Sequence, residues 1–80
     1  MTQDKVYEIW RRELKLGSFS MDDDFFMLGG HSLIMTRIQH EIGTEIGVEV
    51  PMDELFRKST VASISAYIDS LAAAPQGSAA

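Results

Sequence analysis

Apolar residues recur at helical spacing in three stretches of the chain, and polar residues fill the positions between them. The first stretch predicts a helix over about residues 3–16, which Gly17 would end. Its apolar positions are Val6, Ile9, Trp10 and Leu14. Because these positions follow the 3.6-residue period, one face of this helix is expected to join a core.

Two further helices follow from the same pattern. The second is predicted over about residues 32–46, with Gly47 as its end, and its apolar positions are Ile34, Met35, Ile38, Ile42 and Ile46. The last begins after Thr60, a favoured N-cap residue, and its apolar positions are Val61, Ile64, Ile68 and Leu71. Between them, "DELFRK" is long enough only for a short helix, and "VEV" before Pro51 is expected to be extended.

The connection formed by residues 17–31 has no clear period and is long by ordinary standards. Its many large apolar side chains indicate that it packs onto the domain, and long ordered loops often carry function. Phe25 and Phe26 are adjacent, so we expect one of them to anchor the loop and the other to face elsewhere; the pattern leaves open which.

These elements predict an all-α fold, a small four-helix bundle of three main helices and one short helix with a long ordered first loop. The 80 residues imply one domain, 1–80, with a core over about residues 5–72 and a flexible tail over 73–80.

Charge and composition narrow the classes of function. The net charge of −5 disfavours nucleic acid as a partner and favours a basic protein surface. The absence of cysteine excludes disulfides and thiolate metal sites and is consistent with the cytoplasm. The first residues lack the apolar core of a signal peptide, and no apolar run is long enough to cross a membrane.

Candidate chemistry centres on Ser32, which follows Gly29, Gly30 and His31 at the start of the second helix. The pattern alone favours a plain N-cap role for this serine. A hydrolase nucleophile is disfavoured, because the G-x-S-x-G turn would need glycine where Ile34 stands. The glycines could simply form a tight turn, or their bare backbone and the free amides of the helix could admit a phosphate. A P-loop is excluded, because no lysine follows the glycines.

Three consecutive aspartates, residues 22–24, precede the phenylalanines. Their spacing does not match a calcium loop, which alternates its oxygen ligands and closes with a glutamate. We expect one or two of them to brace the loop through hydrogen bonds to its backbone, and we predict no metal site.

Several segments of the chain resemble those of a known family. "DDDFFMLGGHSL" resembles the phosphopantetheine attachment motif of peptidyl carrier proteins, the thiolation domains of nonribosomal peptide synthetases. "VYEIWRRELKLG" resembles the first helix of that family, and "GVEVPMDELFRKSTVASISAYI" resembles its third and fourth helices. The resemblance covers roughly residues 5–72.

The resemblance implies a carrier without catalytic residues of its own. Ser32 would receive a 4'-phosphopantetheine arm from coenzyme A, transferred by a phosphopantetheinyl transferase that uses Mg²⁺, with Gly29, Gly30, His31 and Leu33 as flanking recognition residues. The arm's thiol would hold an aminoacyl or peptidyl group as a thioester. The implied partners are an adenylation enzyme and condensation, thioesterase or tailoring enzymes, which would meet a monomeric cytoplasmic carrier.

Partner enzymes are expected to dock weakly on an apolar patch beside Ser32. The residues predicted for this patch are Leu33, Met35, Met52 and Phe56.

Three positions depart from the family's pattern. Ser59 stands where proline is common, Met27 where an acid is common, and Gly43 interrupts the second helix. Two alternatives stay open. One is an acyl carrier of a polyketide or hybrid pathway, although the histidine before Ser32 favours a peptidyl carrier. The other is a small helical adaptor in which Ser32 is only a cap. The sequence leaves open which group is carried, and whether the carrier is free-standing or a domain taken from a larger protein.

Overall fold

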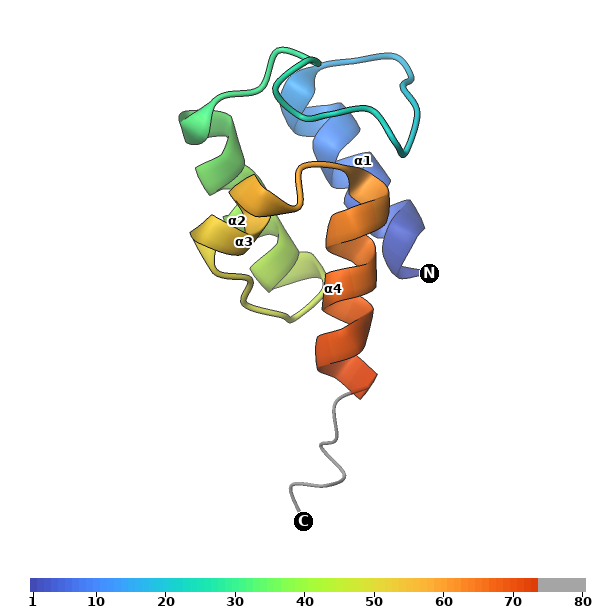
Figure 1. Cartoon of the computed structure of the whole chain (residues 1–80), viewed down its shortest axis with the longest axis vertical. Coiled ribbons are helices and arrows are strands. Elements are labelled where there is room, and N and C mark those ends of the chain that lie inside the picture. Colours follow the sequence, from blue (N-terminus) through green and yellow to red (C-terminus); the bar gives the residue numbers. More distant parts are fainter. Residues whose placement is uncertain (74–80) are drawn as a thin grey trace.

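The computed structural model describes the backbone of residues 1–73 and the side chains as far as Leu71. Its four helices are α1 (Thr2–Leu14), α2 (Ser32–Glu45), α3 (Met52–Arg57) and α4 (Val61–Ala73) (Figure 1). These described residues form no strand, so the predicted all-α bundle of three main helices and one short helix is confirmed. The predicted flexible tail lies outside the described residues, apart from Ala73 at the end of α4.

Helix α1 lies against both α2 and α4, and α2 also contacts the short α3. The predicted helix face of α1 is buried, since Val6, Ile9 and Trp10 are inaccessible to solvent. The predicted end at Gly17 is wrong by two residues. Lys15 adopts a left-handed conformation with φ of 57°, and its amide donates to the carbonyls of the last helical turn. The chain therefore leaves α1 before it reaches the glycine.

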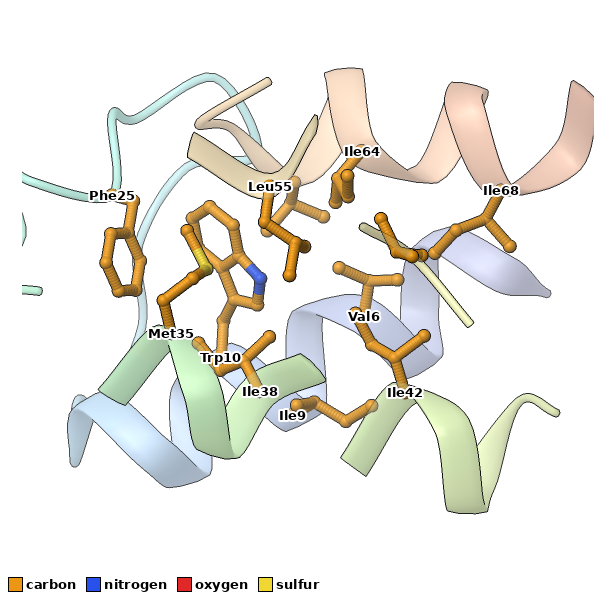
Figure 2. Close-up of a cluster of buried hydrophobic side chains, with 12 residues drawn as sticks. Val6, Ile9, Trp10, Phe25, Met35, Ile38, Ile42, Leu55, Ile64 and Ile68 are labelled. Atoms are coloured by element: carbon orange, nitrogen blue, oxygen red, sulfur yellow. The ribbon is translucent and has the colours of Figure 1, made fainter. Parts of the chain in front are cut away.

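One hydrophobic core joins all four helices and the first loop, residues 15–31 (Figure 2). Its fully buried members are Val6, Ile9, Trp10, Phe25, Met35, Ile38, Ile42, Val50, Leu55, Val61, Ile64 and Ile68. Each aliphatic side chain in this set contributes about 1.5–3 kcal/mol of burial free energy, and the aromatic ones contribute more, so these residues dominate the stability of a chain this small.

Trp10 is a core residue, as the sequence indicated. Its ring meets that of Phe25 edge to face, with centroids 5.2 Å apart, and Figure 2 shows it between Phe25 and the aliphatic side chains. The indole N–H has no hydrogen-bond partner within the described part of the chain. That unsatisfied donor is a cost that the surrounding apolar burial must offset.

The first loop packs onto the bundle, as its apolar content predicted. Phe19 stacks on Tyr7 of α1 with ring centroids 4.4 Å apart, and the Phe19 amide donates to the Tyr7 hydroxyl at 3.0 Å. Further along, the carbonyl of Met21 accepts from the Ala62 amide in the first turn of α4 at 3.0 Å. The loop is therefore tied to both helices that flank it.

The start of α4 matches its prediction. The Thr60 hydroxyl accepts a hydrogen bond from the Ser63 amide at 3.1 Å, which is the geometry of an N-cap. The segment before α3 belongs to no helix or strand, with Val50 buried and its carbonyl accepting from the Gln39 side chain at 2.8 Å.

Candidate functional site

Ser32 is the first residue of α2, and its side chain is exposed. The N-cap position belongs to His31, whose backbone is extended and whose side chain makes no capping hydrogen bond. The prediction that Ser32 is the N-cap is therefore wrong by one residue. Since no hydrogen bond within the described residues engages its hydroxyl, that oxygen is open to a reaction partner.

The backbone around Ser32 suits an anion. The amide of Met35 is the first in α2 to find a helical partner, the carbonyl of His31 at 3.0 Å. The three amides before it, those of residues 32–34, have no acceptor within the described chain. The first turn contains no acidic residue. Free amides and the helix dipole together favour a negative group at this end of α2.

The glycine pair before Ser32 is required by local geometry. Gly29 has φ of 94°, a conformation in which other residues are strained. A Cβ atom at Gly30 would run into the ring of Phe25, which lies directly beside its backbone. The pair therefore serves the turn and the packing beneath it, and its predicted role in recognition by a transferase stays a prediction.

Two of the three aspartates brace the loop, as predicted. One carboxylate oxygen of Asp24 accepts from the amides of Phe26 and Met27, at 2.9 and 3.2 Å. Asp23 accepts from the amide of Ser20 at 2.8 Å. These bonds shape the turn that leads to Gly29. Within residues 1–73 no group of three or more acidic or histidine side chains could hold a metal ion.

Asp24 also bonds across the molecule. The Ser59 hydroxyl donates to its second carboxylate oxygen. This hydrogen bond, helped by those from the Met27 and Phe26 amides, outweighs desolvation and lowers the pKa of Asp24 from its ordinary value. The carboxylate is therefore ionised at neutral pH and holds its three donors.

The structure decides between the two phenylalanines. Phe25 is fully buried and anchors the loop, whereas Phe26 is 45% exposed. The ring of Phe26 stacks on that of Phe56 in α3, with centroids 5.8 Å apart and planes 14° from parallel. An aromatic shelf formed by Phe26 and Phe56 therefore joins the first loop to α3.

The predicted docking residues divide into two groups. Leu33 is 62% exposed, and Met52 and Phe56 are partly buried at the edge of the core. Met35 was predicted wrongly, because it lies on the inner face of α2 and is fully buried. A fully buried side chain in this fold has no surface to offer a partner enzyme.

Phe26 and Met27 stand outside the docking patch predicted from the sequence, and both are exposed in the turn before Gly29. Met27 is 85% exposed. The sequence feature that indicates an exposed Phe26 is its position next to Phe25, because two adjacent phenylalanines are not both expected to face the core. The signal for Met27 was an apolar residue at a position where the family commonly has an acid.

No helix among residues 1–73 is both long and apolar enough to span a membrane.

Comparison with known proteins identifies a family that matches this chain. The family described as a phosphopantetheine attachment site matches residues 4–68. Surfactin synthase subunit 3 of Bacillus subtilis (strain 168) is 38% identical over 66 residues, which are 82% of this chain and 5% of that protein. The chain therefore spans only a small part of this curated relative.

Two solved structures have a fold similar to that of this chain. The fold superposes with a TM-score of 0.84 on the structure of the phosphopantetheine transferase Sfp in complex with coenzyme A and a peptidyl carrier protein. That match is 30% identical and covers 88% of this chain and 91% of that one. The structure of McyG A-PCP complexed with phenylalanyl-adenylate matches with a TM-score of 0.78 and 30% identity, over 82% of this chain and 10% of that one.

The local chemistry fits the group that this family attaches. Within the described residues the Ser32 hydroxyl makes no hydrogen bond, and the amides of residues 32–34 have no acceptor, which is chemistry that suits an anionic group. The matched family spans residues 4–68, which is most of the chain. The chain belongs to the family of phosphopantetheine attachment domains, as a peptidyl carrier domain.

Proposed function

We propose that Ser32 is the residue to which phosphopantetheine is attached, and that the domain carries aminoacyl or peptidyl groups in nonribosomal peptide synthesis. The observation that carries this proposal is the exposed Ser32 hydroxyl, free of hydrogen bonds in the described chain, at a helix start with three open amides. A serine with only a structural role at a helix start would accept a capping hydrogen bond from a backbone amide of the first turn.

In the attachment step the Ser32 oxygen bonds to a phosphorus of the pyrophosphate of coenzyme A. The bridging P–O bond breaks, the nucleotide part leaves with its phosphate, and the serine proton passes to a base. Mg²⁺ held by the transferase would neutralise charge on the pyrophosphate. When bound, the group supplies a thiol that forms a thioester with the cargo. This chain presents the hydroxyl and the open amides, and it has no catalytic role.

The relatives support two of the proposed partners. One similar structure contains a carrier with a phosphopantetheine transferase, which supports such an enzyme as the partner that loads this chain. Another is described as an A-PCP protein with phenylalanyl-adenylate, which supports an adenylation enzyme as the source of cargo. Condensation, thioesterase or tailoring enzymes would then remove the cargo from a monomeric carrier. The absence of cysteine is consistent with work in the cytoplasm.

We further propose that these enzymes dock on the apolar side chains around Ser32. Leu33, Met52 and Phe56 keep exposed or partly exposed apolar surface, and Phe26, whose ring stacks on Phe56, extends it from the first loop. A patch of only a few apolar side chains suits a weak and short-lived complex, as a carrier that visits several enzymes requires.

The experiment is a two-step loading assay. Incubation with coenzyme A, Mg²⁺ and a promiscuous phosphopantetheinyl transferase should add the mass of one phosphopantetheine to the intact protein. A panel of adenylation enzymes with ATP and amino acids should then add one aminoacyl group that hydroxylamine removes. A helical adaptor would gain no mass in the first step, and an acyl carrier would take up phosphopantetheine but no amino acid.

A further inference from the structure

Two segments that are far apart in the sequence meet beside the attachment loop. The first loop and the connection between α3 and α4 are joined by the bond from the Ser59 hydroxyl to Asp24. The Phe25 amide donates to the Ser59 carbonyl at 2.7 Å. Asp24 and Phe25 thus form one side-chain and one main-chain hydrogen bond with the same residue. We call this pair of bonds the loop clasp.

The loop clasp acts on the turn that carries the aromatic shelf. One oxygen of Asp24 is bound to Ser59, and the other accepts from the amides of Phe26 and Met27. Because the Ser59 hydroxyl holds the Asp24 carboxylate in place, the carboxylate in turn fixes the backbone amides of Phe26 and Met27. If the Ser59 hydroxyl is removed, Asp24 keeps its bonds to the turn amides but loses its own bond to the α3–α4 connection, and only the main-chain bond from the Phe25 amide to the Ser59 carbonyl remains of the loop clasp.

The position of this turn affects two features, the aromatic shelf and the backbone that leads to Ser32. Phe26 stacks on Phe56 only while the loop lies over α3. The buried ring of Phe25 lies directly beside the backbone of Gly30, two residues before Ser32. The stacking of Phe26 on Phe56 and the access of a partner enzyme to Ser32 therefore both depend on the position of this turn.

We propose that Ser59 is a positioning residue for docking and loading, acting through Asp24 to hold Phe26 and the turn before Ser32 in one conformation. This inference rests on the proposed function of Ser32. Serine replaces the proline that the resemblance leads one to expect at this position, and proline has no hydroxyl to donate. The side-chain half of the loop clasp is therefore a feature of this chain.

The test compares Ser59→Ala, which removes the hydroxyl, with Ser59→Thr, which keeps it. Both retain the carbonyl that accepts from the Phe25 amide. Ser18→Ala, in the same loop but exposed and outside the clasp, is the matched control. The measurements are KM and kcat for loading by a phosphopantetheinyl transferase with coenzyme A, and hydrogen exchange of the backbone amides.

For Ser59→Ala we expect KM for the carrier to rise about five- to ten-fold with kcat nearly unchanged. Exchange of the Phe26 and Met27 amides should become about ten-fold faster, while α1 and α4 keep their protection. Ser59→Thr and Ser18→Ala should behave as the wild type does.

Three results would overturn the inference. They are an unchanged KM in Ser59→Ala, exchange that accelerates equally in α1 and α4, and a defect in Ser59→Thr as large as that in Ser59→Ala. The second would assign the hydroxyl to general stability. Failure of the proposed function looks different, because the wild-type protein itself would then take up no phosphopantetheine.

Discussion

Replacing each of the two adjacent phenylalanines by alanine should have sharply different effects on folding. A buried phenylalanine removes roughly 150–250 Å² from water, worth about 4–6 kcal/mol at 25 cal/mol per Å². Measured losses for such truncations are about 3–5 kcal/mol, which we expect for Phe25→Ala because its side chain is fully buried against Trp10. Phe26 keeps 45% of its surface exposed, so Phe26→Ala should cost only about 1–2 kcal/mol.

The difference is large relative to the whole stability. A domain of 80 residues has a free energy of unfolding of about 4–12 kcal/mol, so Phe25→Ala would leave the fold marginal or unfolded. The intermediate variant Phe25→Leu keeps most of the apolar volume and should lose about 1–1.5 kcal/mol. It keeps the comparison measurable if the alanine variant does not fold.

The assay is urea unfolding followed by far-ultraviolet circular dichroism, which reports the helices. Fluorescence of Trp10 is less suitable, because that ring touches Phe25 and its signal would change with the substitution itself. An unchanged m-value would indicate that stability alone has changed. Equal losses in the two alanine variants, or a loss below about 1 kcal/mol for Phe25→Ala, would refute the assignment of Phe25 as the loop's anchor.

Three further predictions concern the surroundings of Ser32. Gly30→Ala should lower the free energy of unfolding by about 1–3 kcal/mol, because the new Cβ would push against the Phe25 ring; wild-type stability in urea would mean that the ring can move aside. Leu33→Glu should raise KM for loading severalfold without changing the melting temperature, because Leu33 is mostly exposed; a matching fall in melting temperature would assign Leu33 to the core. The pKa of Asp24 is lowered in the folded state, chiefly by the Ser59 hydroxyl. The charged carboxylate therefore stabilises the fold at pH values above an aspartate's ordinary pKa of about 3.9. This stabilisation is lost as the pH falls from about 3.9 through the lower pKa of the folded state. The free energy of unfolding should therefore fall more between pH 7 and pH 3 in the wild type than in Asp24→Asn, and equal falls would contradict the lowered pKa.

The helices could be predicted because their core faces follow the helical period. Ile38 and Ile42 lie on the inner face of α2, as expected. Period alone did not separate Ile34, which is partly buried, from Met35, which is fully buried. Adjacent residues at the edge of a helix stripe differ by 100° in direction, and the position of α1 decides which of them faces inward.

The N-cap of α2 was predicted one residue too late, at Ser32 instead of His31, for a similar reason. Serine is common both at the N-cap and in the first turn, so composition cannot separate the two positions. The conformation of Gly29 and the packing of Phe25 against Gly30 fix where the helix begins. These are contacts within a loop that has no period to read. The bond between Asp24 and Ser59 was invisible for the same reason, since it joins residues 35 positions apart.

Mapping the site of modification tests the central claim most directly. Wild type, Ser32→Ala and Ser18→Ala should be treated with coenzyme A, Mg²⁺ and a phosphopantetheinyl transferase, digested, and analysed by tandem mass spectrometry. We expect one phosphopantetheine on Ser32 in the wild type and in Ser18→Ala, and none in Ser32→Ala. The Ser32→Ala protein should remain folded, because the Ser32 hydroxyl caps nothing in the structure. Modification of another residue, or loading of folded Ser32→Ala at the wild-type rate, would contradict the account.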